Sequence, residues 1–236
     1  MNESTAARLI ELNRTFYQTF GREFSSTRRR LQPGVLRLLD QMTGAAALLD
    51  LGCGNGELAR ALARRGFGGR YLGLDFSRPL LQETGNLPEN FAFAEADLTA
   101  PDWADRLNTE HWSLITAFAV LHHIPSRQLR LRLLRQVHAL LAPGGEFIHS
   151  EWQFLDSEKW RGRLQPWSEA GLSAADVDPG DYLLDWRGGG RGLRYVHAFD
   201  EAELKALAAA AGFQVRATFR SDGENGRLGL YQVWEK

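Results

Sequence analysis

Short apolar runs alternate with amphipathic segments along the middle of the chain. The apolar runs have the length of buried strands and lie at 46–51, 70–74, 91–94, 114–118 and 146–150. The segments between them carry apolar residues at helical spacing and lie at 57–65, 77–84, 102–108 and 127–141. Strands that alternate with helices in this way predict an α/β fold, with an open parallel sheet covered by helices on both faces.

The pattern changes after residue 200. Asp200 and Glu203 form a helix start signal, and the helix predicted there covers 201–211. Two apolar runs follow it, 213–220 and 228–234, and the turn residues between them favour a hairpin. The hairpin gives the sheet an antiparallel edge strand and raises the predicted total to seven strands.

Two further segments lie outside the alternating pattern. Helical spacing predicts two helices before the first strand, one over 5–20 and one that begins at Pro33. Residues 151–198 contain four tryptophans and a run of glycines but no sustained period, which is typical of a lid or a binding loop. We therefore expect a single domain, with N-terminal helices at 1–45 that cover the site, a core at 46–236, and a lid or substrate-binding insertion at 151–198.

Composition excludes several classes of protein. The chain has 236 residues, of which 44% are hydrophobic and 24% charged, as in soluble globular domains. No apolar run approaches the roughly 18 residues of a membrane span, and the first residues lack the order of a signal peptide, so we expect no membrane association and a cytoplasmic location. The lone Cys53 excludes an internal disulfide, and no Cys/His spacing suggests a metal site.

The charge distribution bears on the choice of partner. The net charge of −1 argues against a protein that coats nucleic acid, although residues 1–70 carry 11 arginines against 6 acidic residues. Arginines outnumber lysines by 25 to 3, which a coding preference explains as well as a phosphate-binding role does. We expect four arginines of one predicted helix to form its solvent face: Arg127, Arg130, Arg132 and Arg135.

The most specific motif follows the first strand. Gly52, Gly54 and Gly56 occupy alternate positions between a buried strand and a helix, so a ligand can contact the main chain at a sharp turn. A dinucleotide site would have a glycine where Glu57 stands, and this carboxylate would repel a diphosphate. Asp50, just before the turn, suits a ligand with an ammonium or sulfonium cation. S-adenosylmethionine therefore fits this motif better than NAD does.

Two more acidic residues follow the next two strands. Asp75 comes 23 positions after Gly52, where a carboxylate can accept hydrogen bonds from both ribose hydroxyls. Asp97 follows the third strand, where it can accept a hydrogen bond from the adenine amino group. Because ligands bind at the carboxyl ends of the strands in open α/β sheets, the three acids together point to one site.

These motifs, with segments 121–124 and 140–145, resemble the class I S-adenosylmethionine-dependent methyltransferases over about residues 40–150. The resemblance implies a Rossmann-like fold and S-adenosylmethionine as cofactor. The family frequently has an acid before the fourth strand, but Trp112 and Ser113 stand there, so we assign no catalytic acid. The neighbours of the three acids and the glycines complete the candidate cofactor site: Cys53, Phe76, Leu98 and Phe118.

The flanking segments 24–28, 194–199 and 230–236 are similar to the eukaryotic wobble-uridine tRNA methyltransferases. Those enzymes esterify the carboxylate of 5-carboxymethyluridine. The chain departs from that family at Gly229-Leu230, where the family has Asn-Trp. It departs again at Gln32-Pro33-Gly34, where the family has Pro-Trp. The resemblance implies a tRNA substrate and leaves open a small activating subunit.

The candidate catalytic residues are chosen for a carboxylate acceptor. An arginine binds a carboxylate through two parallel hydrogen bonds, and further polar groups fix its rotation, so we gather Arg28, Arg194, Tyr195 and His197 around it. His122 follows the fourth strand, beside the methyl end of the cofactor in this fold. A carboxylate needs no general base, whereas a hydroxyl or amine acceptor would need one.

Three functions remain open from the sequence. The first is an S-adenosylmethionine-dependent methyltransferase that acts on tRNA carboxymethyluridine or a related carboxylate. The second is the same chemistry on a free small molecule, with 151–198 closed over it. The third is a non-catalytic module that binds a cofactor or a protein partner, although the glycine turn and its three acids favour an enzyme.

Overall fold

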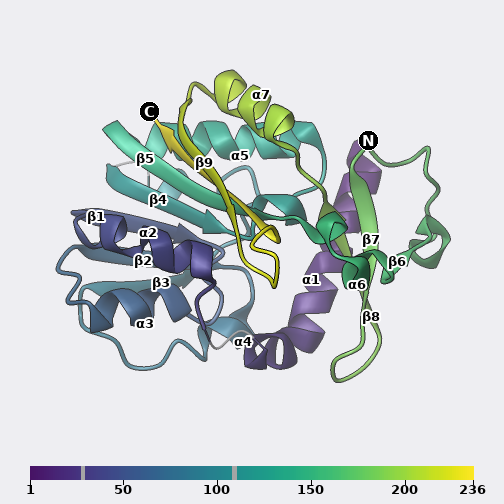
Figure 1. Cartoon of the computed structure of the whole chain (residues 1–236), viewed down its shortest axis with the longest axis horizontal. Helices are drawn as coiled ribbons and strands as arrows, with labels where there is room; N and C mark the ends of the chain where they lie inside the picture. The colour runs from purple at the N-terminus through teal and green to yellow at the C-terminus, as the bar shows by residue number, and fades with distance from the viewer. Residues whose placement is uncertain (28–29, 108–110) are drawn as a thin grey trace.

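One seven-stranded sheet crosses the molecule (Figure 1). The structure is a computed structural model and describes residues 1–27, 30–107 and 111–236. The strand order is β3-β2-β1-β4-β5-β10-β9, and the first five of these strands run parallel. The strands are β1 Ala47–Leu51, β2 Arg70–Asp75, β3 Phe91–Glu95, β4 Trp112–Phe118, β5 Leu141–Trp152, β9 Gln214–Ser221 and β10 Gly229–Glu235.

Helices cover both faces of this sheet, and each face has its own apolar core. α2 (Pro33–Thr43) and α3 (Glu57–Arg64) pack on one face, and α5 (Arg127–Leu140) and α7 (Glu201–Ala211) pack on the other. Because both faces are buried, the central strands are continuous apolar runs rather than alternating ones. The predicted fold class is confirmed, with the strands and long helices close to their expected positions.

The hairpin of β9 and β10 forms one edge of the sheet. β10 is antiparallel to both neighbours, β5 and β9, so β9 is the outermost strand. Asp222 in the connecting turn has a φ of 70° and is tied to α2, because its carboxylate accepts hydrogen bonds from the Gly34 N–H at 2.9 Å and the Tyr231 hydroxyl at 2.5 Å. The turn is therefore joined to the second helix of the chain.

The expectation that 151–198 lacks regular structure is wrong. After β5 the chain forms a small antiparallel sheet, with β7 between β6 and β8, and it runs beside the large sheet (Figure 1). The short period-2 pattern of these strands is hidden because both faces of β7 and β8 are largely buried. The elements of this insertion are η3 Phe154–Asp156, α6 Glu158–Arg161, β6 Leu164–Gln165, η4 Trp167–Ala170, β7 Asp181–Trp186 and β8 Gly192–His197.

The first helix, α1 (Glu3–Ser26), packs along β8. Buried Asn13 substitutes for a neighbouring strand: its side-chain oxygen accepts from the Tyr195 N–H at 2.8 Å, and its amide donates to the Tyr195 carbonyl at 3.1 Å. The same amide donates to the carbonyl of His123 at 3.3 Å. One side chain thus joins α1, β8 and the turn after β4.

Two short helices differ from their predicted lengths. The helix predicted at 77–84 is the single turn α4 (Arg78–Leu81), which has a proline in its first turn. In place of a helix over 102–108, turns lead to the 3₁₀ turn η1 (Asp105–Leu107), and residue 108 lies outside the described part. Another 3₁₀ turn, η2 (Leu121–His123), follows β4. Local helical spacing is too weak a signal for segments of this length.

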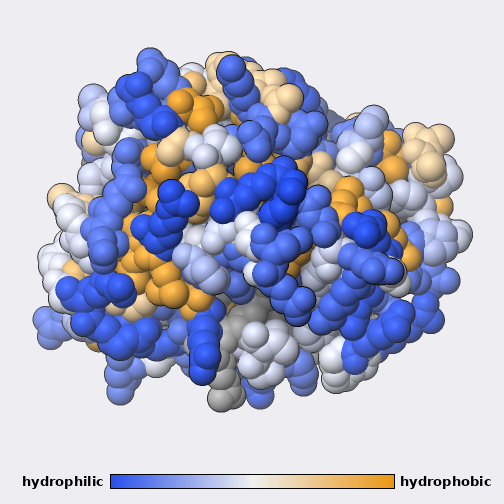
Figure 2. Space-filling view, in the orientation of Figure 1, coloured by the Kyte–Doolittle hydropathy of each residue, from blue (hydrophilic) through white to orange (hydrophobic). Residues whose placement is uncertain are grey.

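The surface is mainly polar. Leu36 of α2 is 46% exposed and is the large hydrophobic residue that stands out among the described ones. Figure 2 shows hydrophobic residues interrupted by hydrophilic ones on the face seen in Figure 1. In the described ranges no helix has both the length and the apolar character that crossing a membrane requires.

Replacement of Asn13 by Ala tests how α1 is held. It leaves the buried N–H and carbonyl of Tyr195 without this partner, so we expect a loss of about 1–3 kcal/mol in the free energy of unfolding. Urea denaturation measures this loss. Gln18→Ala, at an exposed position of the same helix, is the control and should change stability by less than about 0.5 kcal/mol. Equal midpoints for the two variants would contradict this account of the docking.

Candidate active site

A cavity of about 640 Å³ opens at the carboxyl ends of the parallel strands. The core supplies the loops after β1, β2, β3 and β4, and the N-terminal helices and the 151–198 insertion supply the other walls. The core and both flanking segments therefore meet at this cavity. Open α/β sheets bind ligands at this edge.

The glycine turn after β1 forms one wall. Gly52 and Gly54 have φ of 67° and 56°, a region that side chains other than glycine rarely adopt. A Cβ on Gly52 would lie 2.5 Å from Val120, whereas the space beside Gly54 is open. Gly56 also has a positive φ but is the N-cap of α3 and is not part of the cavity lining. Two of the three predicted glycines thus bring bare main chain to the cavity.

Asp50 lies at the cavity wall and is almost fully buried. Its carboxylate accepts hydrogen bonds from the hydroxyls of Tyr71 at 2.6 Å and Thr116 at 2.7 Å. Burial raises the pKa of Asp50 to about 6, although the two hydrogen bonds oppose the shift. At neutral pH Asp50 is an anion held by neutral donors, so a cationic group of a ligand finds an uncompensated charge there.

Asp75 connects the ends of β1 and β2. Its carboxylate accepts from the Gly54 N–H at 2.9 Å on one oxygen and from the Ser77 N–H at 2.8 Å on the other, and the Phe76 N–H also stabilises it. Burial raises its pKa, against these hydrogen bonds. The carboxylate keeps acceptor capacity, so Asp75 can hold the glycine turn and also accept from ribose hydroxyls, the role predicted for it.

Asp97 lines the cavity as well and is partly exposed. One oxygen accepts from the N–H and hydroxyl of Thr99, and the other forms an ion pair of 2.6 Å with Arg14 of α1. This ion pair links the first helix to the predicted adenine end of the site. The four other residues predicted for the cofactor site also line the cavity: Cys53, Phe76, Leu98 and Phe118.

The predicted substrate residues are divided by the structure. His122 and Arg194 line the cavity, and both are about 1% exposed. Tyr195 and His197 do not line it, so the structure does not bring them together with Arg194 at the cavity wall as expected. Arg28 lies outside the described residues and stays a prediction.

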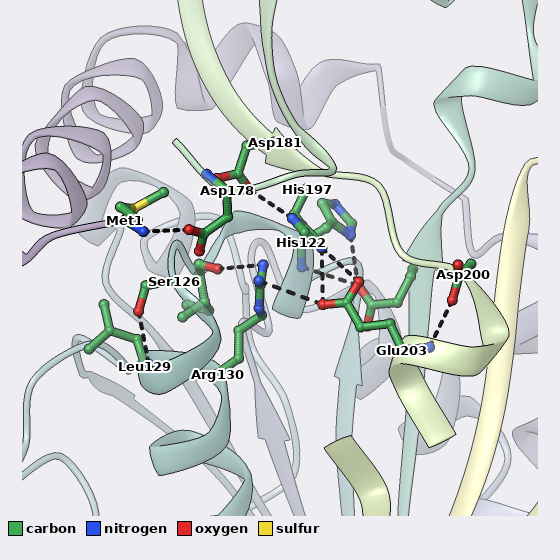
Figure 3. Close-up of polar contacts among 12 residues, drawn as sticks. Met1, His122, Ser126, Leu129, Arg130, Asp178, Asp181, His197, Asp200 and Glu203 are labelled. Atoms are coloured by element: carbon green, nitrogen blue, oxygen red, sulfur yellow. Dashed lines mark hydrogen bonds and ion pairs between the residues drawn. The ribbon is translucent and has the colours of Figure 1, made fainter. Parts of the chain in front are cut away.

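His197 belongs to a buried polar cluster with Asp181 and Glu203 instead (Figure 3), and the Tyr195 hydroxyl joins this cluster at Asp181. Both donate to Asp181 at 2.7 Å, and the other ring nitrogen of His197 contacts Glu203 at 2.9 Å. Burial alone would lower the pKa of His197, but the bonds to the two carboxylates outweigh it and raise the pKa. Arg130 lies in the same cluster, 3.6 Å from Glu203, and is 1% exposed, so its expected place on the solvent face is also wrong.

Several residues at the cavity were not predicted. The Nδ1 of His123 lies 3.2 Å from the Tyr195 carbonyl, which can only accept, so Nδ1 carries the hydrogen of the neutral ring. The Nε2 of His123 is then an acceptor, and the hydroxyl of Tyr17 in α1 donates to it at 2.9 Å. Glu151 follows the fifth predicted strand directly, the same position that drew attention to Asp75 and Asp97, so the sequence contained a signal for it. Trp152 and Trp160 lie in the insertion, where no periodicity showed which side they face.

The fold and the site together define a class I S-adenosylmethionine-dependent methyltransferase. The chain belongs to the family described as a methyltransferase domain, whose model matches residues 24–218. The solved DhpI-SAM-HEP complex has the same fold, with a TM-score of 0.69 at 21% identity over 97% of this chain and 98% of that chain.

Three relatives show the range of the family. A protein of Encephalitozoon cuniculi that carries a methyltransferase name is 28% identical over 85% of this chain and 86% of its own length. The tRNA (carboxymethyluridine(34)-5-O)-methyltransferase of Arabidopsis thaliana is 27% identical over 58% of this chain, and the match covers 31% of that enzyme. The trans-aconitate 2-methyltransferase of Pseudomonas aeruginosa is 33% identical over 63% of this chain and 52% of its own length. The chain thus spans about a third and about half of the last two enzymes.

The residues of the cavity fit the cofactor. The open space beside Gly54 gives room for a close ligand, and Asp50 offers an anion to its cationic part. Asp75 has lone pairs for the ribose, and Asp97 lies beyond it for the base. S-adenosylmethionine requires this combination of cationic, ribose and adenine contacts.

We expect the affinity for S-adenosylhomocysteine, which keeps the ammonium group of the cofactor, to depend on the protonation of Asp50. Since the pKa of Asp50 is about 6, the carboxylate is mostly ionised at pH 7 and mostly protonated at pH 5. The affinity should therefore fall roughly tenfold as the pH is lowered from 7 to 5, as measured by calorimetry. Asp50→Asn should bind more weakly at pH 7 and lose most of this dependence. Equal affinities of the native protein at both pH values would contradict the role of Asp50.

Proposed function

We propose that the protein methylates a carboxylate, and that this carboxylate is carried by 5-carboxymethyluridine at the wobble position of tRNA. The observation that carries the proposal is the position of Arg194, a cation almost fully buried in the wall of the cavity that the cofactor residues also line. A guanidinium binds a carboxylate through two parallel hydrogen bonds. In a wall shielded from water this attraction is stronger than at the protein surface.

The surroundings of Arg194 hold its guanidinium in place. Its central carbon lies 4.9 Å from the ring centre of Trp152 and 5.5 Å from that of Phe16. Burial lowers the pKa of Arg194, and the Tyr17 hydroxyl opposes this shift, yet an arginine remains charged at neutral pH. The aromatic contacts fix the plane of the guanidinium and so the direction from which a carboxylate can approach.

Aromatic side chains from both flanking segments line the same cavity. Trp152 and Trp160 meet edge to face, with ring centres 4.7 Å apart, and Tyr17 meets Phe76 in the same way at 5.8 Å. Lys159 lies beside Trp160 and also lines the cavity. Aromatic faces next to cations suit a planar base that carries a negative charge.

Methyl transfer to a carboxylate requires the protein to position the acceptor oxygen and little else. When bound, S-adenosylmethionine supplies an electrophilic methyl group, and a carboxylate oxygen can accept it without losing a proton. Arg194 orients the carboxylate, and the walls formed by α1 and the insertion exclude water from it. Alignment of the two reacting atoms can then supply most of the rate enhancement.

The comparisons support a carboxylate acceptor, because carboxymethyluridine and trans-aconitate, the compounds in the names of two relatives, both carry carboxylates. A free small carboxylate is the second candidate. It is favoured by the Pseudomonas relative, which has the higher identity over a similar share of this chain. The two candidates share Arg194 and differ in what surrounds the carboxylate.

Labelled S-adenosylmethionine tests both candidates in one assay. The protein is incubated with tRNA that carries carboxymethyluridine, with unmodified tRNA, and with trans-aconitate, and the products are treated with mild alkali. We expect label on the modified tRNA alone, released by alkali as methanol because the product is a methyl ester. Alkali-stable label would exclude a carboxylate acceptor, and label on trans-aconitate alone would assign the small-molecule substrate.

Arg194→Lys tests the arginine itself. The variant keeps the positive charge but loses the planar pair of donors, so we expect the rate of methyl transfer to fall at least about tenfold. The affinity for S-adenosylhomocysteine should not change. Arg191→Lys, at an exposed position between β7 and β8, is the control and should retain full activity. A fully active Arg194→Lys variant would remove Arg194 from substrate binding.

A further inference from the structure

Glu151 is a buried acid near the end of β5, and it contacts two histidines beside the cavity. Its side chain is fully buried, and its Oε2 accepts from the backbone N–H of His122 at 3.1 Å and lies 3.0 Å from the Nδ1 of the same residue. Its Oε1 lies 3.0 Å from the Nδ1 of His149. Figure 3 shows where His122 lies relative to Arg130 and Glu203. His122 lines the cavity, so whatever fixes its ring also fixes what the ring presents there.

A second contact decides which nitrogen of His122 carries the hydrogen. The backbone N–H of Trp152 donates to the Nδ1 of His122 at 3.3 Å. A peptide N–H can only donate, so Nδ1 is an acceptor and the hydrogen of the neutral ring is on Nε2. The hydrogen between Nδ1 and the Oε2 of Glu151 then belongs to the carboxyl group, and the single lone pair of Nδ1 accepts both from this O–H at 3.0 Å and, more weakly, from the Trp152 N–H in a three-centre bond.

The charges around Glu151 favour the same arrangement. In the described part of the chain no Arg or Lys nitrogen lies within 4 Å of its carboxyl group, and the charged residues around it are Arg130 of α5 and Glu203 of α7. Burial raises the pKa of Glu151 well above its usual range, and burial lowers the pKa of His149 to about 3. Burial thus favours the neutral form of both groups, and the Nδ1–H of His149 then donates to the remaining carbonyl oxygen, Oε1.

We propose that Glu151 is a positioning residue that acts in its protonated form, and that it holds His122 as the Nε2–H tautomer. His122 then offers the cavity a hydrogen-bond donor and is not a general base. The alternative, an ionised Glu151 that accepts from Nδ1–H, would bury a charge without a cation in contact and would turn two N–H groups toward each other at Nδ1.

This tautomer narrows the class of acceptor. A donor at His122 and the guanidinium of Arg194, both in the cavity wall, suit an anionic oxygen acceptor. A hydroxyl or amine acceptor would instead need a base that removes its proton. In this respect the inference rests on the proposed function, whereas the state of Glu151 and His122 holds for the protein without substrate.

Nitrogen-15 NMR of the labelled protein, alone and with S-adenosylhomocysteine, measures the tautomer directly. At pH 7 we expect His122 to show a protonated Nε2 and a bare Nδ1, and His149 to show the reverse. His111 is exposed and serves as the reference signal in the same spectra. A hydrogen on the Nδ1 of His122 at neutral pH would overturn the proposal.

Two substitutions of His122 separate a donor from a base. Gln places an amide N–H near the position of Nε2 but has no basic nitrogen, so His122→Gln should keep methyl transfer within about tenfold of the native rate. His122→Ala removes the donor and should lose roughly 100-fold. If Gln and Ala were equally inactive while both variants bound S-adenosylhomocysteine normally, His122 would be a base and the proposal would fail.

The pH profile of the native enzyme completes the test. With His122 as a donor, kcat at saturating S-adenosylmethionine should not fall as the pH is lowered from 8 to 6, because saturation removes the effect of Asp50 on cofactor affinity. Among the described residues, Glu151 and Trp152 of β5 and His123 of η2 face His122, and the charges of Arg130 and Glu203 act on Glu151. If the tautomer is as expected but no carboxylate is methylated, the state of His122 stands and the proposed function falls.

Discussion

The character of this site is determined by carboxyl groups that are buried at one edge of the sheet and contact no cation among the described residues. Asp50, Asp75 and Glu151 are each at most 7% exposed, and burial raises the pKa of each. Hydroxyls and peptide N–H groups stabilise Asp50 and Asp75, but these neutral donors do not cancel a charge. A cationic ligand therefore supplies the positive charge that neutralises these carboxylates. For this reason the cofactor end of the cavity suits a sulfonium compound rather than a diphosphate.

The substrate end is organised by contacts between segments far apart in the chain. Asn13 and Tyr17 of α1 join the backbone of Tyr195 in β8 to the His123 turn after β4. The cluster of Asp181, His197 and Glu203 lies behind this junction and connects the insertion to α7. The insertion is thus fixed to the core by buried polar bonds and carries Arg194, Trp152 and Trp160 into the cavity wall.

The sequence predicts the cofactor end of the molecule better than the substrate end, for a physical reason. A buried strand, three turn glycines and the acids at strand ends are local signals, because the fold places the carboxyl ends of neighbouring strands together. The partners of Tyr195 and His197 are Asp181 and Glu203, and nothing in the sequence showed that these acids would turn the two side chains away from the cavity. The prediction that Arg130 lies on the solvent face of its helix is wrong for the same reason. Helical spacing does not reveal that Glu203, a carboxylate from another helix, lies beside it.

The place of β10 in the sheet also affects how the chain must fold. β5 is a twelve-residue strand, and the partner on its outer side is formed by residues 229–235, some eighty positions later. During synthesis β5 therefore presents an unpaired edge until residues 229–235 have left the ribosome, and Trp234, fully buried in the finished core, arrives with them. Cooperative assembly of the sheet then depends on its final strand, so ribosome-bound intermediates of this protein are the species most exposed to edge-to-edge aggregation.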